Sequence, residues 1–197
     1  MRSSGHRGRP PTSDDGGQTA YESSVGRKAH AVVARLLGRD TADLPDDPLE
    51  RAKLILGVTQ DVISGSRAAE RERATGAEVA GAAAVYLRRF RLPLPWELMG
   101  SELPLEDKRV DLVFHSGSSQ QILIDELKFG LGTSRAAADH QAQEYVRVGR
   151  TRWGDRFLGV RLCLVSAPMR STFYSATDGS TSPLLTPGGT ATRPLIQ

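Results

Sequence analysis

A chain of 197 residues with 39% hydrophobic residues is long enough to bury one globular core. The net charge of +3 and the isoelectric point near 9.3 are compatible with a nucleic-acid partner but do not establish one. The single cysteine, Cys163, excludes an intrachain disulfide and a zinc cluster of cysteines. Apolar stretches stay short of the about 20 residues of a membrane span, and the polar N-terminal segment has no apolar signal-peptide region. We therefore expect a cytoplasmic protein with no membrane partner.

Composition divides the chain into one domain and two tails. Residues 1–24 are rich in Ser, Gly and Pro and are predicted to form a disordered tail. Residues 171–197 are rich in Ser, Thr, Gly and Pro and are predicted to form a loosely ordered tail. The domain is expected over 25–170, with N-terminal helices over 25–65 and its core over 66–168.

The first part of this domain follows helical periodicity. Apolar residues over 29–37 recur at helical spacing, and a second helix is expected after an acidic loop at 40–50. A longer helix is predicted over 66–90, and the prolines that follow it end the helical region.

The second part of the domain changes to strand periodicity. Three short strands are predicted at 97–105, 110–115 and 121–129. The third carries apolar residues on both faces, which is typical of a central strand covered on each side. A helix over 134–148 and a strand over 157–165 complete the order. We therefore expect an α/β fold with a mixed sheet between helical layers.

One lysine is unusual because the chain otherwise uses arginine. Of the 26 basic residues only four are lysine, and one of these is Lys128, two residues after Glu126 on the third predicted strand. Side chains alternate along a strand, so these two share a face. A lysine is a compact point charge, whereas an arginine is a bulky fork that does not deprotonate. The pattern indicates a position that needs an ammonium group.

The predicted hairpin brings a second carboxylate to the same face. A tight turn over 116–119 places Asp111 opposite Ile124 and diagonal to Glu126. Two carboxylates on a buried strand pair are costly, and a divalent cation relieves their repulsion. Mg²⁺ is expected because it prefers carboxylate oxygens, with Mn²⁺ as a substitute. Lys128 would then orient or activate the attacking water. The simpler alternative is an ordinary ion pair between Glu126 and Lys128, with Asp111 capping a turn.

These motifs together resemble the PD-(D/E)xK nuclease superfamily. The matching residues are Asp111, Glu126, Leu127, Lys128 and, in the Q-x-x-x-Y pattern of the RecB-like branch, Gln141 and Tyr145. The resemblance implies a restriction-endonuclease-like αβββαβ core with extra N-terminal helices, and a helix that brings Gln141 and Tyr145 beside the site. It also implies that the backbone carbonyl of Leu127 completes the metal shell. A glutamate on the helix before the sheet, for which Glu78 is the candidate, would add a third carboxylate. Val110 stands where the motif has a proline.

Arginines gather before and after these motifs. Arg88 and Arg89 precede the predicted sheet, whereas Arg147 and Arg150 follow the Q-x-x-x-Y residues. Both groups are predicted to hold phosphates on either side of the scissile bond. An interpretation with equal weight is that these arginines are solvated residues at helix C-termini, where the helix dipole favours positive charge.

The function implied by the resemblance is a Mg²⁺-dependent deoxyribonuclease that hydrolyses DNA phosphodiester bonds in defence, restriction or repair. A homodimer or a partner subunit stays open. The alternatives are an RNA-directed nuclease and a catalytically inactive nuclease-fold subunit that binds nucleic acid or protein.

His115 and His140 are the histidines expected nearest to the site. Asp125 lies on the opposite face of its strand from Glu126 and is expected to pair with an arginine.

Overall fold

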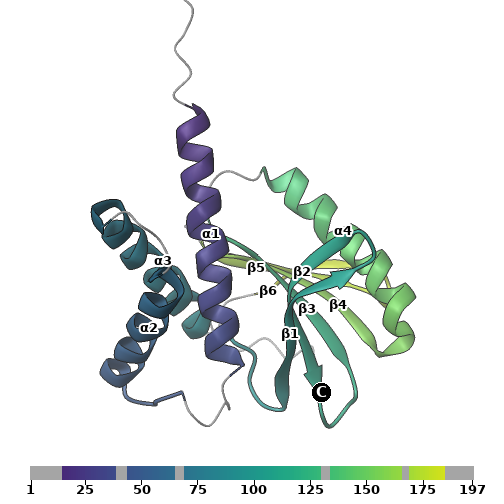
Figure 1. Cartoon of the computed structure of the whole chain (residues 1–197). Helices are drawn as coiled ribbons and strands as arrows, with labels where there is room; N and C mark the ends of the chain where they lie inside the picture. Colours follow the sequence, from purple (N-terminus) through teal and green to yellow (C-terminus); the bar gives the residue numbers. More distant parts are fainter. Residues whose placement is uncertain (1–14, 39–43, 65–68, 130–133, 166–168, 185–197) are drawn as a thin grey trace, which may run out of the picture.

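A computed structural model describes residues 15–38, 44–64, 69–129, 134–165 and 169–184. These residues form three layers, in which a central sheet separates a group of three helices from one further helix (Figure 1). The expected class, α/β with a mixed sheet flanked by helices, is therefore confirmed.

Three helices lie on one side of the sheet: α1 (Asp15–Leu37), α2 (Pro48–Ile63) and α3 (Ala69–Arg89). The side chain of Asp47 caps α2 by accepting hydrogen bonds from two backbone N–H groups of its first turn. Helix α1 begins at Asp15, so residues 15–24 are helical where the sequence predicts a disordered tail. The first turn of a helix is the unfavourable step in its formation, and the packed second half of α1 provides that step. Extending the helix toward its N-terminus then costs little free energy, because each added residue forms a hydrogen bond. No helix in the described part of the chain is long and apolar enough to cross a membrane.

In the part of the chain that the structure describes, six strands form one sheet in the order β1-β2-β3-β4-β5-β6. Their bounds are Trp96–Leu105, Lys108–Ser116, Ile122–Lys128, Phe157–Leu164, Arg170–Ser175 and Thr181–Leu184. Only β3 and β4 are parallel, because helix α4 (Arg135–Trp153) and a short 3₁₀ turn connect them across the other face. Strand β6 and all of β5 after its first residue fall in the segment 171–197 that the sequence predicts to be a loosely ordered tail. That prediction is wrong for residues 171–184.

Each face of the sheet carries its own hydrophobic core. One core joins helices α1, α2 and α3 to side chains such as Leu112, Leu123 and Leu127, and the other joins α4 to side chains such as Val113 and Ile124. Strand β3 contributes to both, and six of its seven residues are buried. It is therefore the central strand that its apolar sequence predicts.

The hairpin between β2 and β3 has a wider turn than the sequence predicts. His115 pairs with Ile122, not with Gln120 as a tight turn over 116–119 requires. Gln120 has a φ of 58°, and its N–H bonds back to the Ser116 carbonyl, so it belongs to the turn. The register therefore differs by two residues, and Asp111 aligns with Glu126 instead of Ile124. Because side chains repeat every two residues, the faces are unchanged.

A close contact fixes α4 on the sheet. A Cβ atom at Gly149 would lie 2.3 Å from the ring of Phe157, so only glycine allows this approach between α4 and β4. The first half of α4 lies beside the end of β3, where Gln141 accepts a hydrogen bond from Lys128.

Candidate active site

A chain of hydrogen bonds joins the end of β3 to helix α4. The Lys128 ammonium donates to Glu126 Oε1 at 2.6 Å and to Gln141 Oε1 at 2.8 Å. Gln141 Nε2 donates to the Tyr145 hydroxyl at 2.7 Å, and that hydroxyl donates to the Arg109 carbonyl at 2.6 Å. Gln141 and Tyr145 share a helix face because they are four residues apart. The structure thus brings four of the predicted site residues into one connected group.

Asp111 joins this group where β2 and β3 separate. The described backbone pairing of the two strands ends at Leu112 and Asp125, one step before Asp111. In place of the next backbone bond, Asp111 Oδ2 accepts from the Leu127 N–H at 2.7 Å. The second oxygen, Oδ1, is directed toward helix α1, 3.3 Å from His30 Nδ1.

His30 is a site residue that the sequence analysis missed. Its Nε2 lies 3.2 Å from the Leu127 carbonyl oxygen, and its ring packs against Phe129 with centroids 5.1 Å apart. Burial lowers the pKa of the His30 imidazole, which favours its neutral form. One signal was present in the sequence: His30 is a polar residue directly beside the buried Ala29, at the border of the apolar stripe of α1.

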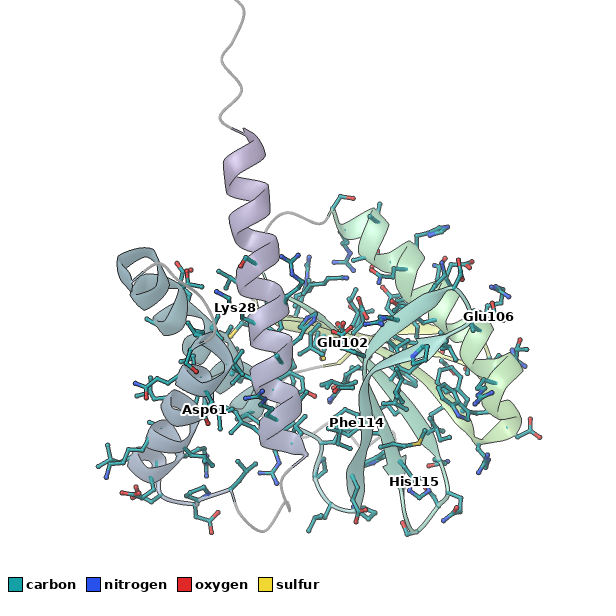
Figure 2. All side chains as sticks on the ribbon, viewed as in Figure 1. Lys28, Asp61, Glu102, Glu106, Phe114 and His115 are labelled. Carbon is teal, nitrogen blue, oxygen red and sulfur yellow. The ribbon has the colours of Figure 1, made fainter. Side chains whose placement is uncertain are left out.

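The third carboxylate at this place is Glu102 of β1, not Glu78. The ligand atoms of His30, Glu102 and Asp111 all lie within 4.8 Å of one another. Glu102 faces Asp111 across the β1–β2 hairpin, and Figure 2 shows it between α1 and the strands. Glu78 is exposed on α3 and lies outside this group, because the neighbouring Val79 takes the position that packs into the core.

Burial governs the acidity of the two central carboxyl groups. It raises the pKa of Asp111 to about 7, against the opposing effects of the Leu127 N–H and Lys128. Burial, and then the charge of Asp111, raises the pKa of Glu126 to about 8, although Lys128 opposes this. The two groups titrate as a pair, and without a cation they retain protons near neutral pH.

The donor set fits a hard divalent cation. Glu126 Oε2 is buried and has no hydrogen-bond partner in the described part of the chain, which is costly unless a ligand satisfies it. Adjacent ligands of an octahedral Mg²⁺ with bonds of about 2.1 Å lie about 3.0 Å apart. The 3.2 Å between His30 Nε2 and the Leu127 carbonyl oxygen is close to this spacing. Carboxylate, carbonyl and imidazole groups thus converge where one cation could bind.

Within the described residues, no observed contact joins the predicted histidines and arginines to this group. His115 lies at the far end of β2 from the site (Figure 2), and His140 is exposed on α4. The two pairs of arginines lie on helices that cover opposite faces of the sheet. Arg147 contacts Glu106 at 3.3 Å and Glu144 at 3.5 Å. Arg88 and Arg150 are exposed, whereas Arg89 is half-buried.

Asp125 has the structural role that its position on β3 predicts. It is fully buried on the face opposite Glu126, where Arg161 Nε donates to it at 2.8 Å and the Tyr86 hydroxyl at 2.7 Å. A second Arg161 nitrogen bonds both Asp125 and the Phe90 carbonyl. This pairing holds α3, β3 and β4 together directly behind the site.

Comparison of the chain with models of protein families, with curated proteins and with solved structures finds no match. A functional assignment therefore depends on the residues and their geometry.

Proposed function

We propose that this protein is a Mg²⁺-dependent nuclease of the PD-(D/E)xK superfamily, RecB-like branch, which hydrolyses DNA phosphodiester bonds. One observation carries the proposal: Asp111, Glu126, Lys128 and the Gln141–Tyr145 pair come from three separate elements and meet in one connected group. The order α3, β1, β2, β3, α4, β4 agrees with the αβββαβ core of that superfamily. The buried, unpartnered oxygen of Glu126 supports a cation at the same place.

The side chains divide the work of such a reaction. Asp111, Glu126, the Leu127 carbonyl and His30 would hold Mg²⁺, which supplies Lewis-acid stabilisation of charge on the phosphate. Mn²⁺ offers similar chemistry to the same oxygen-rich donor set.

Lys128 has a role that depends on its hydrogen-bond count. An ammonium has three N–H donors, and two of them are directed at Glu126 and Gln141. The third remains for the attacking water or for a phosphate oxygen that gains negative charge. Tyr145 fixes the orientation of the Gln141 amide, so the amide oxygen faces Lys128. The ammonium is thereby held at one point on the protein.

The test is a cleavage assay on supercoiled, linear and single-stranded DNA with Mg²⁺, Mn²⁺ or EDTA. It compares the wild type with Lys128→Ala and with Lys53→Ala, a control on α2 whose side chain is 61% exposed. We expect metal-dependent cutting by the wild type and the control, and none by Lys128→Ala. DNA binding should persist in all three proteins.

The rival outcomes are distinct. No cutting of DNA or RNA and no cation binding by calorimetry would overturn the proposal in favour of a non-catalytic binding subunit. Preferred cutting of RNA in a competition assay would change the substrate class and leave the site assignment intact. A partner subunit or a homodimer is tested by light scattering with and without DNA.

A further inference from the structure

The imidazole of His30 has acceptors at both of its nitrogens. Nε2 faces the Leu127 carbonyl at 3.2 Å, whereas Nδ1 faces Asp111 Oδ1 at 3.3 Å and Glu102 Oε1 at 3.8 Å. A neutral imidazole has a single N–H and cannot donate in both directions. An imidazole that binds a metal is neutral and keeps its proton on the other nitrogen.

Two geometric facts decide which nitrogen keeps the proton. The Leu127 carbonyl lies 3.2 Å from Nε2, and Glu126, the residue before Leu127 on β3, has a buried oxygen without a hydrogen-bond partner among the described residues. Asp111 Oδ2 is already occupied by the Leu127 N–H, so its Oδ1 is the oxygen left for a cation. The remaining acceptor near Nδ1 is Glu102, whose carboxylate has no other partner within the described residues.

We infer that Glu102 is a positioning residue: its carboxylate accepts the Nδ1–H of His30 and so directs Nε2 toward the cation beside the Leu127 carbonyl. This inference rests on the proposed function, because it requires a cation at that site. Metal-binding histidines generally donate their second ring nitrogen to a carboxylate or carbonyl, which fixes ring orientation and tautomer. The present 3.8 Å is longer than a hydrogen bond, and the Glu102 side chain is 49% exposed, which leaves it room to approach.

The conformation of Glu102 separates this role from a structural one. Glu102 has a φ of 50°, in the left-handed region that favours glycine. Glycine adopts this backbone conformation without strain, so the Glu102→Gly substitution should not lower the stability of the fold unless the glutamate side chain itself stabilises it. For a positioning residue, Glu102→Gly leaves the melting temperature in EDTA unchanged or higher and still weakens cation binding.

The experiment measures Mn²⁺ affinity by calorimetry for the wild type, Glu102→Ala, Glu102→Gln and Glu97→Ala. Glu97 is an exposed glutamate on the same strand and serves as the control. We expect about a 10- to 100-fold weaker affinity for Glu102→Ala, a smaller loss for Glu102→Gln, and none for Glu97→Ala. In a His30→Ala background, Glu102→Ala should have no further effect, because the carboxylate acts through the ring.

A spectroscopic measurement supplies the second readout. Long-range ¹H–¹⁵N spectra of the Mg²⁺-loaded wild type should show the His30 proton on Nδ1, and Glu102→Ala should lose this single tautomer. The inference is overturned if Glu102→Ala binds Mn²⁺ as the wild type does. It is also overturned if Glu102→Gln loses as much as Glu102→Ala and the proton lies on Nε2, since Glu102 would then be a direct ligand. A wild type that binds no divalent cation would instead remove the proposed function itself.

Discussion

Cation binding to this site should depend steeply on pH. The carboxyl groups of Asp111 and Glu126 have pKa values of about 7 and about 8, raised mainly by burial. Both must be ionised to hold a divalent cation, so binding displaces their protons. The pKa of His30 is lowered by burial, so its proton adds little in this range.

The size of the effect follows from the two pKa values. With about 7 and about 8 taken as the two successive deprotonation steps of the pair, the fraction of molecules with both carboxyl groups ionised is roughly 0.001 at pH 6 and roughly 0.5 at pH 8. The apparent affinity for Mn²⁺ should therefore rise by roughly 500-fold over these two pH units, or about 4 kcal/mol. At pH 6 each cation should release about two protons.

Calorimetry in two buffers of different ionisation enthalpy measures both quantities at once. The observed heat changes with the buffer in proportion to the protons released, and the affinity is read from the same titration. Asp111→Asn removes one of the two titrating groups, so its residual binding should lose about half of the pH slope. An affinity that changes less than about 5-fold between pH 6 and pH 8 would refute the reasoning. It would mean that the carboxylates are ionised without the cation.

Three further outcomes are expected. Asp111→Asn should abolish tight cation binding yet raise the melting temperature in EDTA at pH 8, because a raised carboxyl pKa costs stability as pH rises from the unfolded toward the folded value; a drop in melting temperature would make Asp111 structural. Lys128→Arg should lower cleavage by at least about 100-fold at unchanged stability, since the guanidinium fork cannot take the place of the ammonium; retained cleavage would refute a need for lysine. Gly149→Ala should destabilise the fold by about 1–3 kcal/mol in thermal unfolding, because its Cβ would collide with Phe157. Its control, Gly57→Ala on α2, meets open space and should be neutral or stabilising.

Local sequence patterns were sufficient to predict the strands that carry the site. Strand β3 is apolar on both faces, and its alternation places Glu126 and Lys128 together without knowledge of the rest of the fold. In the same way, the helical spacing of four residues predicts that Gln141 and Tyr145 lie on one face of α4. These relations extend over two to four residues, which is the range that periodicity covers.

Longer-range relations could not be predicted in the same way. His30 meets the Leu127 carbonyl across a sequence separation of 97 residues, and no local pattern encodes that contact. Glu102 depends on the pairing of β1 with β2, which is interrupted by an irregularity between Leu98 and Gly100. The last two strands were missed because the Ser, Gly and Pro residues of this segment outweighed the strand-favouring Thr172, Phe173 and Tyr174, and because the pairing of β5 with β4 is not visible in the sequence.

The long separation between His30 and β3 also bears on the protein during its synthesis. The chain leaves the ribosome from its N-terminus, so His30 emerges well before β3 and before the α4 residue Tyr145. A nascent chain that ends before Tyr145 lacks the hydroxyl that holds Gln141 and, through it, Lys128. The closing of so long a loop must also be offset by packing that forms only when the sheet is present. Incomplete chains should therefore be inert, and the chemistry of the site should begin only when the domain has folded as a unit.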